Sequence, residues 1–406
     1  MKLQPAYDGI SSLKEITDSV RAVINSRNEK LTDAQVLELI EEYVLHGPKT
    51  EGCPFSVKAE VVKGVFNTTR KELGLLQCFA DDPAISEIMV NGTDSIFVER
   101  KGRIEKTNQR FENTEELEEI IRRLAGKVHR EINDLNPILD ARMSDGSRIH
   151  AVNRNVAING PILSIRRFPE QRITIEELIK LDTLSEESAV FLRKLIICGF
   201  NIFISGGTSS GKTTLLNALS GFIPRDERIV VIEDSAELQI QGVENIVRME
   251  CRGANVQGKG EVSIRQLIRA SLRMRPDRII VGEVRGSEVM DMLQAMNTGH
   301  DGSLSTGHAN SPGGMLSRLE AMYLSAEAFP IDAVRSQIVE AIDIIVHLGR
   351  MPDKSRKILE IVEAEGFEQG KYLLNPLFQY QRGKGLISTG NKIKNCGKAE
   401  RKGIAL

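Results

Sequence analysis

The spacing of apolar residues changes along the chain, and each change marks a region. Up to about residue 80, apolar side chains recur every three or four positions, which is the spacing of amphipathic helices. The clearest stretch, residues 34–44, opens with a capping box from Thr32 to Gln35 and stops at Gly47 and Pro48. We therefore predict an N-terminal helical region over residues 1–80.

From residue 81 the pattern becomes that of short strands joined by tight turns. Apolar runs flank Asn91 and Gly92, and Asp145 and Gly146 mark a second hairpin turn. Between them, Asn113 caps a helix whose apolar residues share one face. This order of elements predicts a small α+β domain over residues 81–168, followed by a linker over residues 169–182.

Beyond residue 183, apolar strands alternate with helical segments. We expect the strands near Asn201, Arg228, Arg278, Ser303 and Asp343. Such alternation favours a three-layer α/β domain with a mostly parallel sheet, which we place at residues 183–381.

Residues 382–406 have no such periodicity, and they carry seven Lys and Arg residues against one acidic residue. We predict a basic, solvated and mobile tail. The alternative is a segment that contacts acidic lipid or an acidic face of a partner.

Composition excludes several classes of function. The net charge is −2, aromatic residues make up 4% and Trp is absent, so a nucleic-acid partner is not expected. The five cysteines form no Cys-x-x-Cys pair, which favours reduced thiols over a zinc site. No apolar run approaches the ~20 residues of a membrane span, and the first residues lack a signal core. We expect a cytoplasmic protein without a membrane span.

The strongest chemical signal is a phosphate-binding loop. Gly206-x-x-x-x-Gly211-Lys212-Thr213 follows an apolar strand and precedes a helical pattern, which is the setting this motif requires. Its glycines let successive N–H groups face phosphate oxygens, and the following helix adds its positive end. Lys212 can then reach the terminal phosphates, and the Thr213 hydroxyl can ligate Mg²⁺. The residues predicted to hold the nucleotide are Gly206, Gly207, Thr208, Ser209, Ser210, Gly211, Lys212, Thr213 and Thr214.

Two glutamates follow buried apolar runs, where parallel sheets place their functional groups. Glu233 ends residues 228–233, and Glu283 follows residues 278–282. We assign Glu283 to Mg²⁺, through water, and Glu233 to the activation of the attacking water. The reverse assignment stays open.

Two of the six histidines, His300 and His308, lie eight residues apart around a short strand. A zinc site is one alternative, although this spacing is unusual for zinc ligands. A pair of structural histidines is another. We favour a sensor of the γ-phosphate or of the attacking water, partly because of the family resemblance that follows.

Four motifs in order resemble the secretion ATPase superfamily, which powers type II and type IV secretion and type IV pilus extension and retraction. They are the phosphate loop, the acidic segment ending at Glu233, the strand ending at Glu283, and the histidine segment. Residues 82–92, 140–148, 296–310 and 317–322 further resemble the CpaF-type ATPases of Flp/Tad pilus assembly, and the likeness spans roughly residues 82–380. The turn at residues 351–356 departs from the Asp-Gly-x-Arg turn of the family, and we expect it to lie away from the chemistry.

The resemblance implies a RecA-like ATPase domain that uses ATP and Mg²⁺ and assembles as a homohexameric ring. It also implies arginines from the preceding domain at the nucleotide, and the candidates are Arg142, Arg148, Arg166 and Arg167. The implied function is a motor, peripheral at the inner face of the plasma membrane, that acts on an inner-membrane platform protein to assemble a Flp/Tad pilus. A type IV secretion ATPase that drives substrate export is the nearest alternative. A nucleic-acid translocase and a non-motor nucleotide switch are more distant ones.

Overall fold

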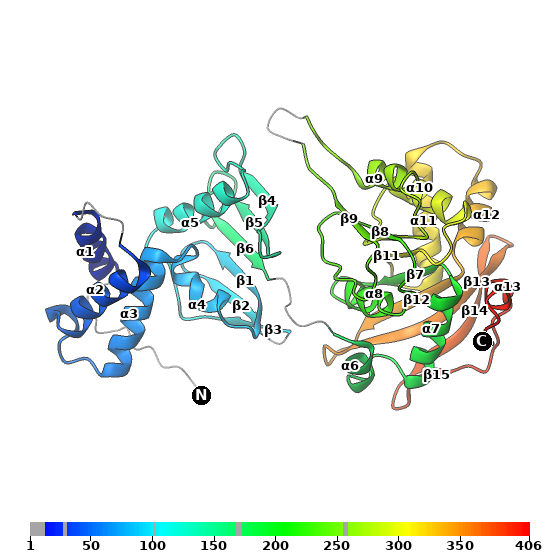
Figure 1. Cartoon of the computed structure of the whole chain (residues 1–406), viewed down its shortest axis with the longest axis horizontal. Helices are drawn as coiled ribbons and strands as arrows, with labels where there is room; N and C mark the ends of the chain where they lie inside the picture. The colour runs from blue at the N-terminus through cyan, green and yellow to red at the C-terminus, as the bar shows by residue number, and fades with distance from the viewer. Residues whose placement is uncertain (1–12, 27–30, 101, 168–172, 255–258) are drawn as a thin grey trace. The chain divides into compact units, whose positions relative to one another are not determined.

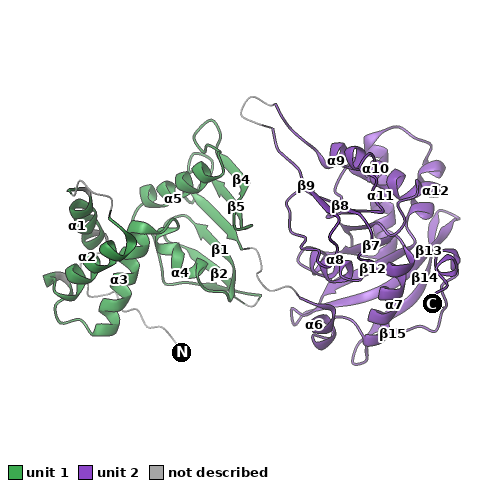
Figure 2. Cartoon of the chain, in the orientation of Figure 1, with its two compact units in different colours: residues 1–169 green, residues 170–406 purple. Residues whose placement is uncertain are grey.

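The chain divides after residue 169 into two compact units (Figures 1 and 2). Unit 1 is Met1–Pro169 and unit 2 is Glu170–Leu406. The computed structural model describes residues 13–26, 31–100, 102–167, 173–254 and 259–406.

Unit 1 begins with helices, as predicted. They are α1 Leu13–Ser26, α2 Asp33–Leu45, η1 Pro48–Thr50, α3 Phe55–Arg70, η2 Gly74–Leu76 and α4 Gln77–Ala80. Apolar residues of α1, α2 and α3, such as Val20, Ile40 and Val65, form one fully buried cluster. The Thr32 capping box is confirmed, since the Thr32 side chain accepts from the N–H of Gln35.

The rest of unit 1 is an antiparallel sheet that packs against one helix, α5 Thr114–Lys127. The sheet runs in the order β3-β2-β1-β6-β5-β4. Its strands are β1 Ile85–Asn91, β2 Ile96–Arg100, β3 Arg103–Lys106, β4 Ile138–Arg142, β5 Arg148–Val152 and β6 Ile162–Arg166. Asn113 caps α5 as expected, and apolar α5 residues such as Leu117 and Ile121 share a core with the sheet residues Ile88 and Leu163.

Unit 2 is built on a larger sheet in the order β15-β14-β13-β12-β7-β11-β10-β8-β9. Neighbours from β12 to β9 are parallel, and β13, β14 and β15 extend that sheet with antiparallel pairing. The strands are β7 Ile202–Gly206, β8 Ile229–Glu233, β9 Ile246–Glu250, β10 Arg278–Val281, β11 Leu304–His308, β12 Ile344–Arg350, β13 Arg356–Glu368, β14 Lys371–Gln381 and β15 Gly385–Ser388. The helices are α6 Ile175–Lys180, α7 Glu186–Cys198, α8 Lys212–Ser220, α9 Ile264–Ser271, α10 Glu288–Asn297, α11 Pro312–Ala326, α12 Ile331–Ala341 and α13 Gly397–Arg401.

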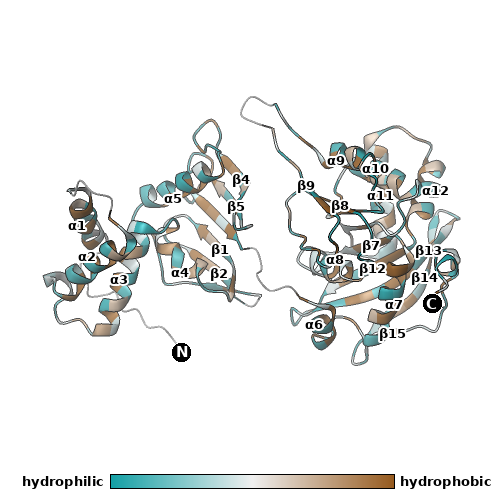
Figure 3. Cartoon of the chain, in the orientation of Figure 1, coloured by the Kyte–Doolittle hydropathy of each residue, from teal (hydrophilic) through white to brown (hydrophobic). Residues whose placement is uncertain are grey.

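Helices cover both faces of this sheet, which gives the predicted three layers. Alternate residues of β7 point to opposite faces, so Ile202 and Ile204 join one core and Phe203 joins the other. The first core includes α7 and α8, and the second includes α10, α11 and α12. Figure 3 shows the central strands in brown, and every residue of β7 and β8 is buried. Continuous apolar strands are expected where both faces are covered.

The tail differs from the prediction, because residues 382–406 fold onto unit 2 instead of forming a mobile segment. β15 pairs with β14, and Ala399 of α13 is buried. Glu363, only 2% exposed, accepts from the backbone N–H groups of Lys394 and Asn395. A buried carboxylate needs such donors, so it fixes a segment whose own sequence has no periodicity.

The linker also differs from the prediction at its second half. Residues 168–172 lie outside the described residues, but α6 follows them and its Ile175 and Leu178 are buried in the core of unit 2. Thr174 forms a capping box with Glu177, which explains why a helix begins there.

Candidate nucleotide-binding site

The phosphate loop joins β7 to α8 and requires glycine at both ends. A Cβ atom on Gly206 would lie 2.5 Å from the carbonyl oxygen of Leu348 in the neighbouring strand β12. Gly211 caps α8 with a φ of 96°, a left-handed conformation that favours glycine. The sequence motif therefore has a direct steric cause, and the loop delivers Lys212 to the first position of α8.

The Lys212 amino group is held against its own loop. Its Nζ donates to the carbonyls of Gly207 at 2.9 Å and Gly206 at 3.3 Å, and to Nδ1 of His308 at 3.2 Å. Burial lowers the pKa of Lys212, and the charge of Glu283 opposes that effect. The amino group thus lies at the loop, where the motif requires it.

The other predicted nucleotide residues follow the loop into the helix. Gly207, Thr208 and Ser209 are exposed, whereas Thr213 and Thr214 are half-buried on the first turn of α8. Ser210 is buried, and its Oγ has no hydrogen-bond partner among the described residues. An unpaired buried hydroxyl within a loop of this shape fits a phosphate ligand.

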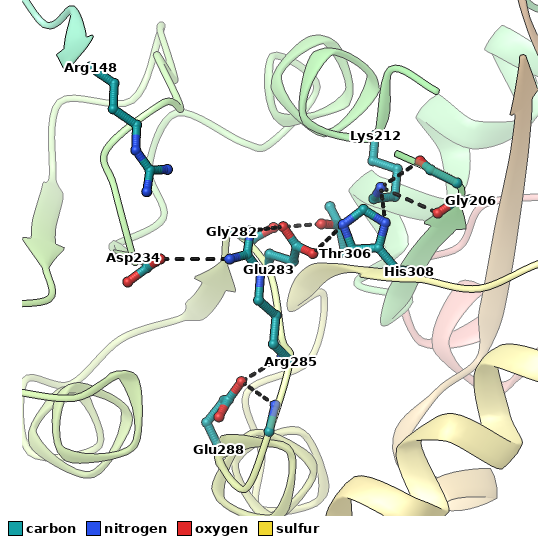
Figure 4. Close-up of polar contacts among 12 residues, drawn as sticks. Arg148, Gly206, Lys212, Asp234, Gly282, Glu283, Arg285, Glu288, Thr306 and His308 are labelled. Atoms are coloured by element: carbon teal, nitrogen blue, oxygen red, sulfur yellow. Dashed lines mark hydrogen bonds and ion pairs between the residues drawn. The ribbon is translucent and has the colours of Figure 1, made fainter. Parts of the chain in front are cut away.

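His308 and Glu283 meet beside the loop because β10 and β11 are parallel and end at the same edge (Figure 4). Nε2 of His308 lies 2.8 Å from Oε1 of Glu283, a distance at which a protonated ring would form an ion pair. The contact lacks hydrogen-bond geometry, so this buried oxygen has no hydrogen-bond partner in the part of the chain that the structure describes. Such an oxygen suits a metal ion or its water ligands.

Charges around this pair set its protonation. Burial alone would raise the pKa of Glu283, but the hydrogen bond and charge of Arg285, at 2.9 Å, lower it overall, with help from His308 and Lys212. Burial lowers the pKa of His308, and the positive charge of Lys212 lowers it further. Near neutral pH the edge therefore holds a carboxylate and a neutral imidazole.

Glu233 ends β8 on the other side of β10 and is 4% exposed. Its Oε1 accepts from the backbone N–H groups of Glu237 and Leu238, both at 2.9 Å. A Cβ atom on Gly282 would lie 2.9 Å from Cγ of Glu233, so glycine there allows the glutamate side chain to lie against β10. The structure thus places Glu233 beside the end of β10, two residues before Glu283.

His300 does not join this group, and its predicted place beside the phosphate loop is wrong. His300 precedes β11, whereas His308 is its last residue. The strand spans about 13 Å, so the two histidines lie at opposite edges of the sheet. The His300 Nδ1 lies 3.0 Å from the carbonyl of Ala295, at the end of α10. The same separation rules out zinc shared by the two histidines.

Arg356 is a residue of the site that the sequence interpretation missed. The turn at residues 351–356 was expected to lie away from the chemistry, and that expectation is wrong. Arg356 Nε donates to the carbonyl of Ser209 at 3.0 Å, in the phosphate loop. The contact joins residues 147 positions apart, so only the pairing of β12 with β7 and β13 could reveal it.

Three of the four predicted arginines of unit 1 have hydrogen-bond partners within that unit. Arg148 forms a two-bond fork with Asp140, at 3.0 and 2.7 Å, across the β4–β5 hairpin. Arg142 donates to the carbonyl of Gly146 at 3.4 Å. Arg167 donates to the carbonyls of Asp82 and Ile85, and Arg166 lies exposed at the end of β6.

The match to a family model covers most of the chain. Residues 70–398 match the family described as type II/IV secretion system protein. The chain belongs to the type II/IV secretion system protein family. This membership confirms the predicted superfamily, whereas the Flp/Tad subgroup stays a prediction.

Individual relatives and structures agree with the family. A putative conjugal transfer protein of Mycobacterium tuberculosis is 35% identical over 311 residues, which cover 74% of this chain and 88% of the relative. Type IV secretion system protein PtlH of Bordetella pertussis is 32% identical over 310 residues, covering 70% and 91%. The crystal structure of the Legionella pneumophila ATPase DotB matches with a TM-score of 0.51 and 21% identity, covering 72% of this chain and 79% of that one. The predicted RecA-like fold of this family is thereby confirmed. Separately, no helix among the described residues has the length and apolarity of a membrane span.

Proposed function

We propose that the chain is the subunit of a homohexameric motor that hydrolyses ATP with Mg²⁺. The observation that carries this proposal is the group formed at one edge of the sheet, where Lys212 contacts His308 and His308 contacts Glu283 (Figure 4). These residues come from three separate segments and meet beside a loop shaped for phosphate. Phosphoryl transfer needs just such positioned charge.

Each residue of the loop has a role toward the nucleotide. The backbone of residues 206–211 would surround the phosphates, and Lys212 would leave the loop carbonyls for the terminal phosphates, which are stronger acceptors. Thr213 and Glu283 offer the hard oxygen donors that Mg²⁺ prefers, with Glu283 acting through water. When bound, Mg²⁺ supplies neutralisation of phosphate charge.

Glu233 is the residue that orients and activates the attacking water. Two backbone N–H groups fix its carboxylate at the end of β8, so its orientation is set in advance. Glu283 is already engaged by Arg285 and lies next to His308, which favours metal binding over proton transfer for that residue. His308 would sense the γ-phosphate, because it lies between Lys212 and Glu283.

An arginine of unit 1, supplied next to the nucleotide in the ring, would offset the charge of the transition state. Arg148 is the first candidate, because its ion pair with Asp140 is partly exposed and such pairs contribute little. A phosphate would be a strong two-bond acceptor for the same fork. Arg167 is the last candidate, since two main-chain carbonyls hold it in unit 1. Arg142 and Arg166 rank between Arg148 and Arg167 as candidates.

The motor would lie in the cytoplasm, peripheral at the inner face of the plasma membrane, and act on an inner-membrane platform protein. Closure of unit 1 on unit 2 during the ATP cycle would supply the stroke. The motif resemblance in residues 82–92 and 296–310 favours Flp/Tad pilus assembly. The names of the relatives, conjugal transfer and type IV secretion proteins, favour a second candidate, export of a substrate.

The test is steady-state phosphate release from Mg²⁺ and ATP, measured across protein concentration together with the mass of the assembly by light scattering. A ring motor predicts activity per subunit that rises steeply as hexamers form. Turnover that is independent of concentration in a monomer would contradict the ring. Stimulation by DNA or RNA would instead point to a translocase.

A further inference from the structure

The first residues of β13 connect the phosphate loop to the segment that follows the linker. Arg356 donates to the carbonyl of Ser209 in the loop at 3.0 Å. The next residue, Lys357, donates from Nζ to the carbonyl and the carboxylate of Asp182, at 2.6 and 2.7 Å. The N–H of Ile358 then donates to the carbonyl of Thr183 at 2.9 Å. Three consecutive residues of β13 therefore contact the phosphate loop on one side and residues 182–183 on the other.

Both anchored residues have a backbone conformation that side chains disfavour. Ser209 has a φ of 57° and Asp182 has a φ of 54°, in the left-handed region. Residues other than glycine stay there only where their surroundings hold them. The bonds from Arg356 and Lys357 act on the carbonyls of these two residues, so they help to hold both conformations.

The two basic side chains differ in burial, so Lys357 is held in place while Arg356 can change its hydrogen-bond partner. Lys357 is 9% exposed and is fixed between β13 and Asp182, whereas Arg356 is exposed over the loop. The Arg356 side chain also lies close to Gly211, since a Cβ atom there would be 3.3 Å from its Cδ. A phosphate oxygen is a stronger acceptor for a guanidinium than the Ser209 carbonyl is. Arg356 is thus placed to change partner when phosphate enters the loop.

We propose that Arg356 and Lys357 form a nucleotide-sensing link between the phosphate loop and residues 181–183, which follow α6. A nucleoside triphosphate in the loop draws Arg356 away from Ser209, and the start of β13 carries this shift to residues 181–183 through Lys357 and Ile358. Arg356 is then a positioning residue that couples nucleotide binding to residues 181–183, which follow α6 at the start of unit 2. The inference rests on the proposed function, because it requires a nucleotide in this loop.

Hydrogen exchange of the full chain tests the link at the amides of Leu181, Asp182 and Thr183. Exchange is measured without ligand and with Mg²⁺ and the slowly hydrolysed analogue ATPγS, while calorimetry records binding. We expect the analogue to change the exchange rate at these amides by about fivefold or more in the wild-type chain. Arg356→Gln loses a phosphate contact and should bind the analogue more weakly, and at saturating analogue it should lose this change. Arg356→Lys should restore part of it.

Two further variants serve as controls. Arg350→Gln removes the same charge from the residue that faces Arg356 across the β12–β13 ladder, and it should keep the change. Lys357→Met cuts the link at its other end and should lose the change while binding stays normal. Binding without any change in the wild-type chain, or a full change in Arg356→Gln, would overturn the link alone. Absence of binding by the wild-type chain would overturn the proposed function, and the link with it.

Discussion

The two edges of the parallel sheet in unit 2 both contain buried charges, yet they hold them in different ways. At the edge where β12 begins, Asp343 is 8% exposed and pairs with Lys398 at 2.7 Å. Arg278, 1% exposed where β10 begins, forms a two-bond fork with Glu227. Both of these buried charges have a partner of opposite sign.

At the edge where β7, β10 and β11 end, the buried cation has a different environment. The hydrogen-bond acceptors around the Lys212 amino group are two loop carbonyls and the imidazole of His308, whose pKa is lowered mainly by burial. These neutral groups leave the cation available to an anion. Buried charge alone therefore does not identify a site in this protein, and the nature of the partners does.

The clearest test of this comparison substitutes one lysine at each edge, Lys212 and Lys398. Lys212→Ala should lower ATP turnover by about 10³-fold, because it removes the charge at the terminal phosphates. Lys398→Met should leave turnover per folded subunit unchanged, because Lys398 pairs with Asp343 and Asp301 at the other edge. Phosphate release at equal folded protein, checked by circular dichroism, measures both. Equal activity of the two variants would erase the distinction between the edges.

The two histidines sharpen the comparison. His308→Ala should lower kcat by about 10²-fold, since it removes a polar group between Lys212 and Glu283. His300→Ala should change kcat by no more than about twofold, because its ring contacts the end of α10. Steady-state kinetics of the matched pair gives the answer. A larger loss in His300→Ala than in His308→Ala would contradict the assignment.

Stability should show the opposite order of effects. Lys398→Met leaves the Asp343 carboxylate buried without its main cation, which typically costs about 3–5 kcal/mol. Lys212→Ala should cost far less, since the partners of its amino group are neutral. Thermal unfolding of the two variants, followed by circular dichroism, tests this order. A lower midpoint for Lys212→Ala would show that its contacts are mainly structural.

The pH dependence is the smallest expected effect. Burial lowers the pKa of His308 in the folded chain below its ordinary value of 6.5, so the ring stays neutral at pH values where an exposed histidine gains a proton. The stability that His308 contributes is present above that ordinary value and is lost as pH falls through the lowered one. Turnover should therefore change by less than about twofold between pH 8 and about pH 6.5. A halving of kcat centred near pH 6.5 that disappears in His308→Ala would contradict the lowered pKa.

Local patterns predicted much of this architecture, and contacts between distant segments were beyond them. The phosphate loop and the strand ends at Glu233 and Glu283 follow from short motifs beside apolar runs. His300 and His308 lie on either side of β11, and the short strand predicted between them already implied this separation. Arg356 reaches Ser209 through pairing of β13 with β12, which no local pattern specifies. The tail is held by Glu363, about thirty residues earlier in the chain, so its weak periodicity was misleading.

The central claim is that the edge with the phosphate loop binds and hydrolyses ATP with Glu233 activating water. Single-turnover hydrolysis of bound ATP by Glu233→Gln, beside the wild-type chain and Glu283→Gln, tests it most directly. The account predicts that Glu233→Gln binds ATP and Mg²⁺ normally but cleaves it at least about 10²-fold more slowly, and that Glu283→Gln mainly weakens the dependence on Mg²⁺. Wild-type cleavage by Glu233→Gln would contradict the account, and a cleavage defect confined to Glu283→Gln would establish the reverse assignment.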